Sequence, residues 1–365
     1  MTTLYTLGWS GLLHRIDAQG RWLVVQALAL DAALAMDDVI GVAAAARVAE
    51  DAGFAALWAN ETKRNPFIQL ALAAPATTRL LLGTGVAIAF PRSPTVMAHL
   101  AWDLALLSGG RFILGLGTQV RAHIQRRFGA PWDPPVPKLR EYLEAVRAVW
   151  RSWQDQVPLR MAGRFYRLSL MTPFFNPGPI AHPEIPIYIA GVNPLLCRLS
   201  GETAQGFHVH PFHTVAYLRS VVLPNIARGR EVRFRPRDAV QLYAPVFVAP
   251  GDTPAEVREA TERARGEIAF YAATPSYRIV PHTHGWDDVA ARLQQLAAQR
   301  RWGELAGQVP EAMLDAVLIR GSWEEIGHQL RSRYAGVLDR VACYRPFTIA
   351  ELPGWRRLAA AFHAG

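Results

Sequence analysis

Residues 79–119 read RLLLGTGVAIAFPRSPTVMAHLAWDLALLSGGRFILGLGTQ, and this stretch predicts a strand, a helix and a second strand in that order. The apolar runs at 80–90 and 111–116 are typical of strands buried on both faces, as in a parallel sheet covered by helices. Between them, residues 94–107 have the apolar spacing of a helix that ends at two glycines. The crossover connection in such a β-α-β unit is right-handed. Glycines at the end of a parallel strand let a ligand approach the backbone.

The same alternation of strands and helices continues along the chain. It predicts eight short strands, at 22–30, 54–58, 80–90, 111–116, 185–190, 207–210, 239–249 and 340–344. This count favours an α/β fold of the closed (β/α)8 TIM-barrel type over an open doubly wound sheet. We expect residues 21–350 to form a single barrel domain, with insertions near 120–137, 157–184 and 252–310. Residues 1–20 are expected to be an N-terminal arm of uncertain order, and residues 351–365 a C-terminal helix.

Composition and charge narrow the class of protein. The chain has 365 residues, 51% of them hydrophobic and 19% charged, as in ordinary globular proteins. Its net charge of +9 comes almost entirely from arginines that are spread along the chain. This spread argues against a nucleic-acid-binding tract and leaves a local anion site open. Cys197 and Cys343 lie far apart in apolar contexts, which predicts buried free thiols.

The sequence shows no segment that would take the protein to or through a membrane. No apolar run reaches the ~20 residues that a membrane helix needs. The N-terminal residues lack the charged, apolar and small-residue order of a signal peptide. We therefore expect a cytoplasmic protein.

Two glycine-containing turns follow predicted strands and could hold an anion. Gly117 and Thr118 end one strand, and arginines and His123 follow them. Ala190, Gly191 and Val192 end the next strand, before an Asn-Pro pair that suits the start of a helix. Exposed backbone N–H groups at such turns bind phosphates, although each turn could equally be a plain strand-to-helix connection.

Ionisable side chains also follow predicted strands. His208, His210 and His213 lie at the end of the sixth strand, where His208 and His210 share a face and could bind zinc. No matching ligand follows the later strands, so these imidazoles are better explained as lining a pocket, and we assign no metal site. Glu61 follows the second strand and could be a pocket acid, or could pair with Lys63 or Arg64 at the rim.

Four segments together resemble the luciferase-like monooxygenase superfamily, and most closely its branch that uses the deazaflavin coenzyme F420. They are LLLGTGVAIAFPRSP, LSGGRFILGLGTQ, IPIYIAGVNP and GFHVHPFH. The resemblance implies a (β/α)8 barrel with insertions and a flavin-type ring across its strand ends. It also implies a non-prolyl cis peptide at Gly85-Val86. Members of the family are often homodimers, which implies the same here.

The resemblance also assigns site residues. It implies cofactor contacts at Gly85, Val86, Gly117, Thr118, His123, Ala190, Gly191 and Val192. It implies that Glu61 borders the deazaflavin ring, and that His210 and His213 lie on the substrate side. The sugar-phosphate dehydrogenases of this branch carry a glutamate where this chain has Val120, and a histidine where it has Thr62. That reaction is therefore not expected.

The predicted function is hydride transfer between coenzyme F420 and a small organic substrate, with Glu61, His210 and His213 as candidate catalytic residues. One alternative is an FMN-dependent monooxygenase of the same superfamily. Others are a non-catalytic flavin or deazaflavin binder and a zinc hydrolase that uses His208 and His210.

Overall fold

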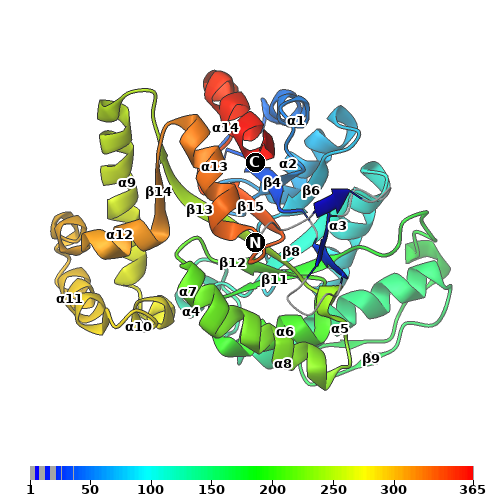
Figure 1. The fold of residues 1–365 in the computed structure, drawn as a ribbon. Coiled ribbons are helices and arrows are strands. Elements are labelled where there is room, and N and C mark those ends of the chain that lie inside the picture. The colour runs from blue at the N-terminus through cyan, green and yellow to red at the C-terminus, as the bar shows by residue number, and fades with distance from the viewer. Residues whose placement is uncertain (1–4, 8–12, 17–21, 26, 36, 365) are drawn as a thin grey trace.

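The predicted barrel is confirmed by a computed structural model, which describes residues 5–7, 13–16, 22–25, 27–35 and 37–364 (Figure 1). Within these residues, eight strand positions close into one parallel ring. The ring closes because β15 pairs with β4, which places Arg340 opposite Ala29. In ring order the strands are β4 (Ala29–Ala33), β5 (Ala56–Ala59), β6 (Leu81–Thr84) with β7 (Ala87–Ile88), β8 (Phe112–Gly117), β11 (Ile187–Gly191), β12 (Gly206–Val209), β13 (Gln241–Pro250) and β15 (Arg340–Cys343).

The first barrel strand differs from the run expected at 22–30. Trp22–Val25 forms β3, which pairs antiparallel with β2 (Leu13–Ile16), and β2 pairs with β1 (Tyr5–Leu7) in a separate small sheet. Only Ala29–Ala33 enters the barrel. A continuous apolar run cannot show where one strand ends and the next begins in another sheet. The rest of the predicted N-terminal arm lies outside the described residues.

Helices cover the outside of the ring (Figure 1). Asn65 and Ser93 begin α2 and α3 by accepting hydrogen bonds from Phe67 N and Val96 N, and a proline follows each cap. No described helix is both long enough and apolar enough to span a bilayer. The covering helices are α1 (Val42–Asp51), α2 (Pro66–Ala73), α3 (Pro94–Leu107), α5 (Pro135–Gln154), α6 (Pro194–Thr203), α7 (Val215–Tyr217), α8 (Leu223–Val232), α13 (Trp323–Tyr334) and α14 (Leu352–Ala364).

Insertions interrupt the alternation after β8, α5 and β13. Helix α4 (Arg121–Arg126) follows β8, and a hairpin of β9 (Met161–Ala162) and β10 (Arg167–Leu168) follows α5. A long insert after β13 contains α9 (Pro254–Ala272), α10 (Ile279–His282), α11 (Asp287–Ala298) and α12 (Glu311–Val317). It returns through β14 (Leu318–Gly321), which pairs with the end of β13 and was not predicted.

Aromatic side chains fill the inside of the ring, where branched aliphatic residues are usual in such barrels. Trp58, Tyr188 and Tyr243 are buried there beside Ile113. A glycine makes room for the indole, because a Cβ on Gly83 would lie 2.2 Å from Cζ3 of Trp58. The barrel interior is therefore packed tightly around large rings.

A buried ion pair joins the first and last barrel strands. Asp31 accepts hydrogen bonds from Nε and Nη2 of Arg340, at 2.8 and 2.6 Å. Trp58 donates its Nε1–H to the same carboxylate at 2.9 Å. The side chains of Arg340 and Asp31 are 8% and 0% exposed, so water does not screen this pair. Cys197 and Cys343 are buried free thiols, as expected.

Candidate active site

The parallel strands end at one face of the barrel, which we call the mouth. Most residues along these strands are buried, whereas the residues at their ends are partly exposed. In a barrel of this type, ligands bind at that face. The partly exposed residues include Asn60 after β5, Gly85 and Val86 after β6, Thr118 after β8, Ala190 and Gly191 at the end of β11, and His210 after β12. The fold thus brings most of the predicted site residues to one face.

The segment between β6 and α3 contains the expected cis peptide bond, at Gly85-Val86. Glu61 holds this segment in place. Its Oε2 accepts a hydrogen bond from Ile88 N at 2.6 Å, and its carboxylate forms a two-point ion pair with Arg92, at 2.8 and 2.7 Å. The Glu61 side chain is only 9% exposed. Glu61 therefore positions the backbone beside Val86, and its partner is Arg92 instead of Lys63 or Arg64.

Replacing Glu61 by glutamine should loosen this segment. The amide cannot accept both Arg92 hydrogen bonds and leaves the guanidinium without its counter-charge, so we expect a loss of about 1.5–3 kcal/mol in the free energy of unfolding. Urea unfolding measures it. Glu324→Gln is the control, because Glu324 forms an exposed 3.4 Å pair with Arg357 that should contribute about 0–1 kcal/mol. Equal effects of the two variants would contradict a positioning role for Glu61.

Two neighbouring strand ends present free backbone donors. Strands β8 and β11 are paired, with Ile189 opposite Leu116, so the turns that follow them lie next to each other. Within the described chain, the N–H groups of Thr118, Val192 and Asn193 donate to no acceptor. Donors that converge from two turns suit an anionic group. This geometry fits the phosphate contacts that the sequence predicts at these turns.

Glycine is needed at both turns. A Cβ on Gly117 would lie 2.6 Å from Cγ2 of Val86, and a Cβ on Gly191 would lie 2.5 Å from Cβ of Leu196. Both distances are shorter than real Cβ contacts, so any side chain would displace its neighbour. Gly117 therefore allows Val86 to reach its position at the mouth.

Of the polar residues near these turns, Asn193 differs from the prediction. Asn193 occupies the N-cap position of α6, but its side chain makes no capping bond and donates to Ser276 O at 3.4 Å. His123 lies on α4 with its side chain exposed, and its imidazole forms no hydrogen bond with any described residue. A cofactor contact by His123 stays a prediction.

The three histidines that follow α6 have different environments. His208 lies inside the barrel, edge-on to Trp58 and Tyr243 with ring centroids 4.8 and 4.9 Å apart. Burial lowers its pKa to about 3, and its Nε2 has no hydrogen-bond partner within the described residues. His213 is also buried and uses both ring nitrogens, with His210 O at 2.9 Å and Tyr334 Oη at 3.1 Å. Burial lowers the pKa of His213 to about 4.

His210 is the histidine that reaches the mouth. Its Nδ1 accepts a hydrogen bond from Phe212 N at 3.1 Å, so the neutral ring carries its proton on Nε2. Burial, followed by the nearby His213, lowers the pKa of His210 to about 3, which keeps the ring neutral at physiological pH. Its Nε2–H donates to no described residue and is available to a ligand.

The buried histidines should make folding sensitive to acid. Their folded pKa values lie below the unfolded value of 6.5, so the unfolded chain binds more protons as the pH falls below 6.5. Stability is then lost on acidification, by about 1.4 kcal/mol per pH unit for each fully buried histidine. We expect His208→Leu to reduce this slope in urea unfolding between about pH 6.5 and 4.5. His182→Gln, at an exposed position, should leave the slope unchanged, and an unchanged slope in His208→Leu would contradict the expectation.

Three tyrosines at the mouth were not predicted. Tyr277 stacks on His210 at 4.2 Å, and Tyr271 meets the same ring edge-on at 4.7 Å. The hydroxyl of Tyr271 lies 2.7 Å from that of Tyr344, which follows β15. Burial raises the pKa of all three, that of Tyr277 to about 12, so their hydroxyls are neutral at physiological pH. Tyr271 and Tyr277 belong to the long insert, whose docking no local pattern could predict.

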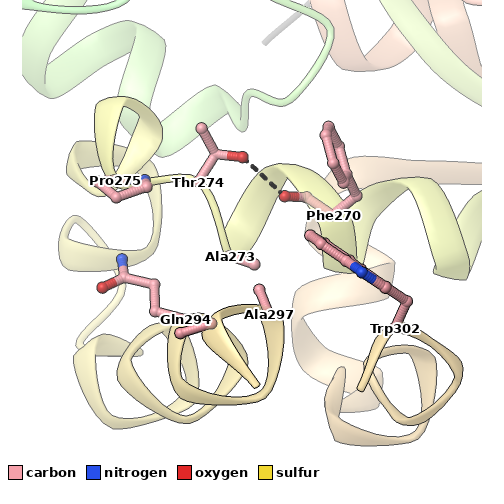
Figure 2. A pocket seen from close by; sticks show the side chains of 8 residues that line it. Phe270, Ala273, Thr274, Pro275, Gln294, Ala297 and Trp302 are labelled. Carbon is pink, nitrogen blue, oxygen red and sulfur yellow. Dashed lines mark hydrogen bonds between the residues drawn. The ribbon is translucent and has the colours of Figure 1, made fainter. Parts of the chain in front are cut away.

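A separate apolar hollow of about 300 Å³ lies between α9 and α11 (Figure 2). Phe270 and Trp302 line it, and Thr274 Oγ1 donates to Phe270 O at 2.9 Å. None of the predicted site residues lines this hollow. Among the described residues, no group of three or more His, Cys, Asp and Glu side chains gathers as a metal site would require.

Comparison with known proteins agrees with this geometry. A profile of the family described as luciferase-like monooxygenase matches residues 24–340. An uncharacterized protein of Mycobacterium tuberculosis (strain ATCC 25618 / H37Rv) is 41% identical over 297 residues, which cover 81% of this chain and 87% of that protein. A 5,10-methylenetetrahydromethanopterin reductase of Archaeoglobus fulgidus is 27% identical over 304 residues, which cover 81% of this chain and 87% of that protein.

One solved structure shows the same fold over nearly the whole chain. It is the coenzyme F420 dependent tetrahydromethanopterin reductase from Methanopyrus kandleri, with a TM-score of 0.76 and 21% identity. The match covers 93% of this chain and 99% of that one.

Proposed function

The chain is an enzyme of the luciferase-like monooxygenase family, and from this premise we propose that it transfers a hydride between coenzyme F420 and a small organic substrate. The observation that carries the proposal is the pair of glycine turns on β8 and β11, with their free N–H groups. The names of the reductases from A. fulgidus and M. kandleri support the choice of reaction, and the latter names F420.

The turns would hold the phosphate of the cofactor. The N–H groups of Thr118, Val192 and Asn193 would donate to its oxygens, and Gly117 and Gly191 keep side chains out of the space between them. Further predicted contacts are Ala190, at the partly exposed end of β11, and His123 on α4. A backbone cradle of this kind needs no titratable group, so phosphate binding should vary little near neutral pH.

The ring of the cofactor would lie against the partly exposed Gly85 and Val86. When bound, F420 supplies the carbon that carries the hydride. Glu61 would act indirectly, because its ion pair with Arg92 fixes the segment beside Val86. His210 would donate its Nε2–H to an oxygen of the substrate, and His213 would orient His210 through its bond to the His210 carbonyl.

Direct binding tests the proposal. Purified full-length protein is titrated with F420 and with FMN, and the dissociation constants are compared by fluorescence. Tighter binding of F420, followed by substrate-dependent oxidation or reduction of F420, supports the proposal. Preference for FMN, with oxygen consumption when reduced FMN is supplied, would replace it with the monooxygenase alternative. Tight binding without turnover on a broad substrate panel would indicate a non-catalytic binder.

We also propose that the enzyme is a homodimer that pairs through α2 and α3. Both helices are apolar nearly all round, although one face of each is exposed, and such helices are normally buried. The exposed fractions are 55% for Ile68, 41% for Leu72, 51% for Val96, 62% for Leu106 and 54% for Leu107.

A cytoplasmic location, expected from the sequence, stays a prediction.

Light scattering after size-exclusion chromatography tests the dimer. The native chain should have twice the mass of one copy, and Ile68→Lys/Val96→Glu should have the mass of one copy because it places charges in the interface. Leu170→Lys is the control, at an exposed apolar position outside these helices. A monomeric native chain would contradict the dimer proposal.

A further inference from the structure

The barrel also has a polar hollow, at the end opposite the mouth. It has a volume of about 460 Å³, which falls in the size range of small-molecule sites. It lies where α5, α6 and the segment after α8 meet, and these helices lie side by side in Figure 1. Gln205 lies there just before β12, whose other end leads to His210 at the mouth. The lining residues are Glu144, Arg147, Arg151, Glu202, Thr203, Gln205, Arg233 and Arg235.

The arginines of this hollow lack carboxylate partners. Arg147, Arg151, Arg233 and Arg235 form no ion pair within the described part of the chain, whereas Glu202 is already paired with two arginines outside the hollow. Arg140 and Arg198 hold that carboxylate, the latter at 3.1 Å, and its side chain is 8% exposed. Among the described residues that line the hollow, Glu144 is the only other carboxylate, so positive charge is in excess.

Two of the arginines have a structural role that explains part of this arrangement. Arg235 donates to the carbonyls of Ser200, Gly201 and Ala204 at the end of α6, and Arg147 donates to Thr203 O at 2.6 Å. Cations at the C-terminus of a helix are favourable. Burial is the larger cause that lowers the pKa of Arg147. The positive charge of the neighbouring Arg235 lowers it further, because the two guanidinium groups repel each other.

Arg151 and Arg233 differ, because their side chains form no ion pair or hydrogen bond within the residues that the structure describes. Both side chains are exposed. Gln205 accepts from Ile187 N at 3.1 Å and from Arg147 at 3.4 Å, so it contributes an amide and no negative charge. An anion in the hollow would relieve the repulsion and pair all four guanidinium groups.

We propose that this hollow is a binding site for a small multivalent oxyanion, either a phosphate ester or a polycarboxylate. The site lies at the N-terminal ends of β11 and β12, whereas the mouth lies at their C-terminal ends, so the two sites are separate. Arg147 and Arg235 are fixed by their bonds to α6 and form its base, and Arg151 and Arg233 close over the ligand. Planar guanidinium groups bind phosphate and carboxylate oxygens in pairs, so both ligand chemistries fit.

Calorimetric titration of the full chain at constant ionic strength tests this proposal, with pyrophosphate in one arm and citrate in the other. We expect saturable binding of at least one of them, weakened about tenfold or more in Arg151→Gln/Arg233→Gln. Both positions are exposed, so the variant should keep its native melting temperature. Gln205→Glu should weaken binding as well, because it places a carboxylate beside Arg147. The arm that binds more tightly identifies the ligand class.

Two controls separate this site from others. Arg258→Gln, at an exposed arginine on α9, should bind like the native chain. Gly117→Ala changes the opposite end of the barrel and should retain the binding that is lost in Arg151→Gln/Arg233→Gln. Absence of saturable binding of both anions, or binding that Arg151→Gln/Arg233→Gln leaves intact, would overturn the proposal. Loss of binding in Gly117→Ala alone would assign the anion to the mouth and would overturn it too.

Discussion

Replacement of Gly117 by alanine is expected to weaken cofactor binding by up to about a hundredfold while the barrel stays folded. The new Cβ would lie 2.6 Å from Cγ2 of Val86, so Val86 must turn toward the space at the mouth. Forcing an extra methyl group into a packed site costs about 1–3 kcal/mol, and each 1.4 kcal/mol is a tenfold change in affinity. Titration with whichever of F420 and FMN binds the native chain measures the effect.

A second substitution should reverse this loss. In Gly117→Ala/Val86→Ala the Cγ2 methyl group that the new Cβ would displace is absent, so we expect most of the cofactor affinity to return. Gly266→Ala is the control, because a Cβ there meets no atom within 4 Å and α9 should gain a little stability. Native affinity in Gly117→Ala would show that Val86 does not shape the cofactor site.

Replacement of Arg340 by methionine should be the most destabilising of the substitutions considered. Asp31 would be left as an unpaired carboxylate at a fully buried position, which costs about 3–5 kcal/mol. Urea unfolding should show a much lower midpoint with a similar slope. The expected loss of stability comes from breaking the ion pair between Asp31 and Arg340, because a methionine side chain is otherwise compatible with an apolar interior.

Removal of both charges should recover much of this stability. In Asp31→Asn/Arg340→Met the asparagine oxygen can still accept the hydrogen bond from Trp58 Nε1. Uncharged groups of similar size are often as stable as a buried ion pair. If the double variant were no more stable than Arg340→Met, the loss would reflect packing around residue 340 and not the isolated charge.

The sequence predicted the features that depend on short stretches of chain. The barrel and the glycine turns at Gly117 and Gly191 depend on local patterns, so residue type and spacing were sufficient to predict them. The cis bond at Gly85-Val86 was predicted from the family resemblance of the same stretch. The split of the run at 22–30 was missed because apolar spacing is the same in either sheet.

The partners of the site residues could not be predicted in the same way. Glu61 pairs with Arg92, 31 positions away, although two cations stand much closer along the chain. His213 uses Tyr334 of α13, and Tyr271 reaches the mouth from the long insert. These contacts depend on how distant elements pack. The presence of three histidines near the end of the sixth strand therefore could not show which imidazole faces a ligand and which is buried in the protein.

The pairing of β13 with β14 has a consequence for protein engineering. Pro250 lies opposite Gly321, and Gly251 N donates to Gly321 O at 3.2 Å, so residues 251–320 leave and rejoin the barrel at adjacent points. Such a segment could be exchanged between relatives as a cassette without changing the distance between its two attachment points. Because it carries Tyr271 and Tyr277 to the mouth, a cassette graft could change substrate preference while leaving the cofactor turns intact.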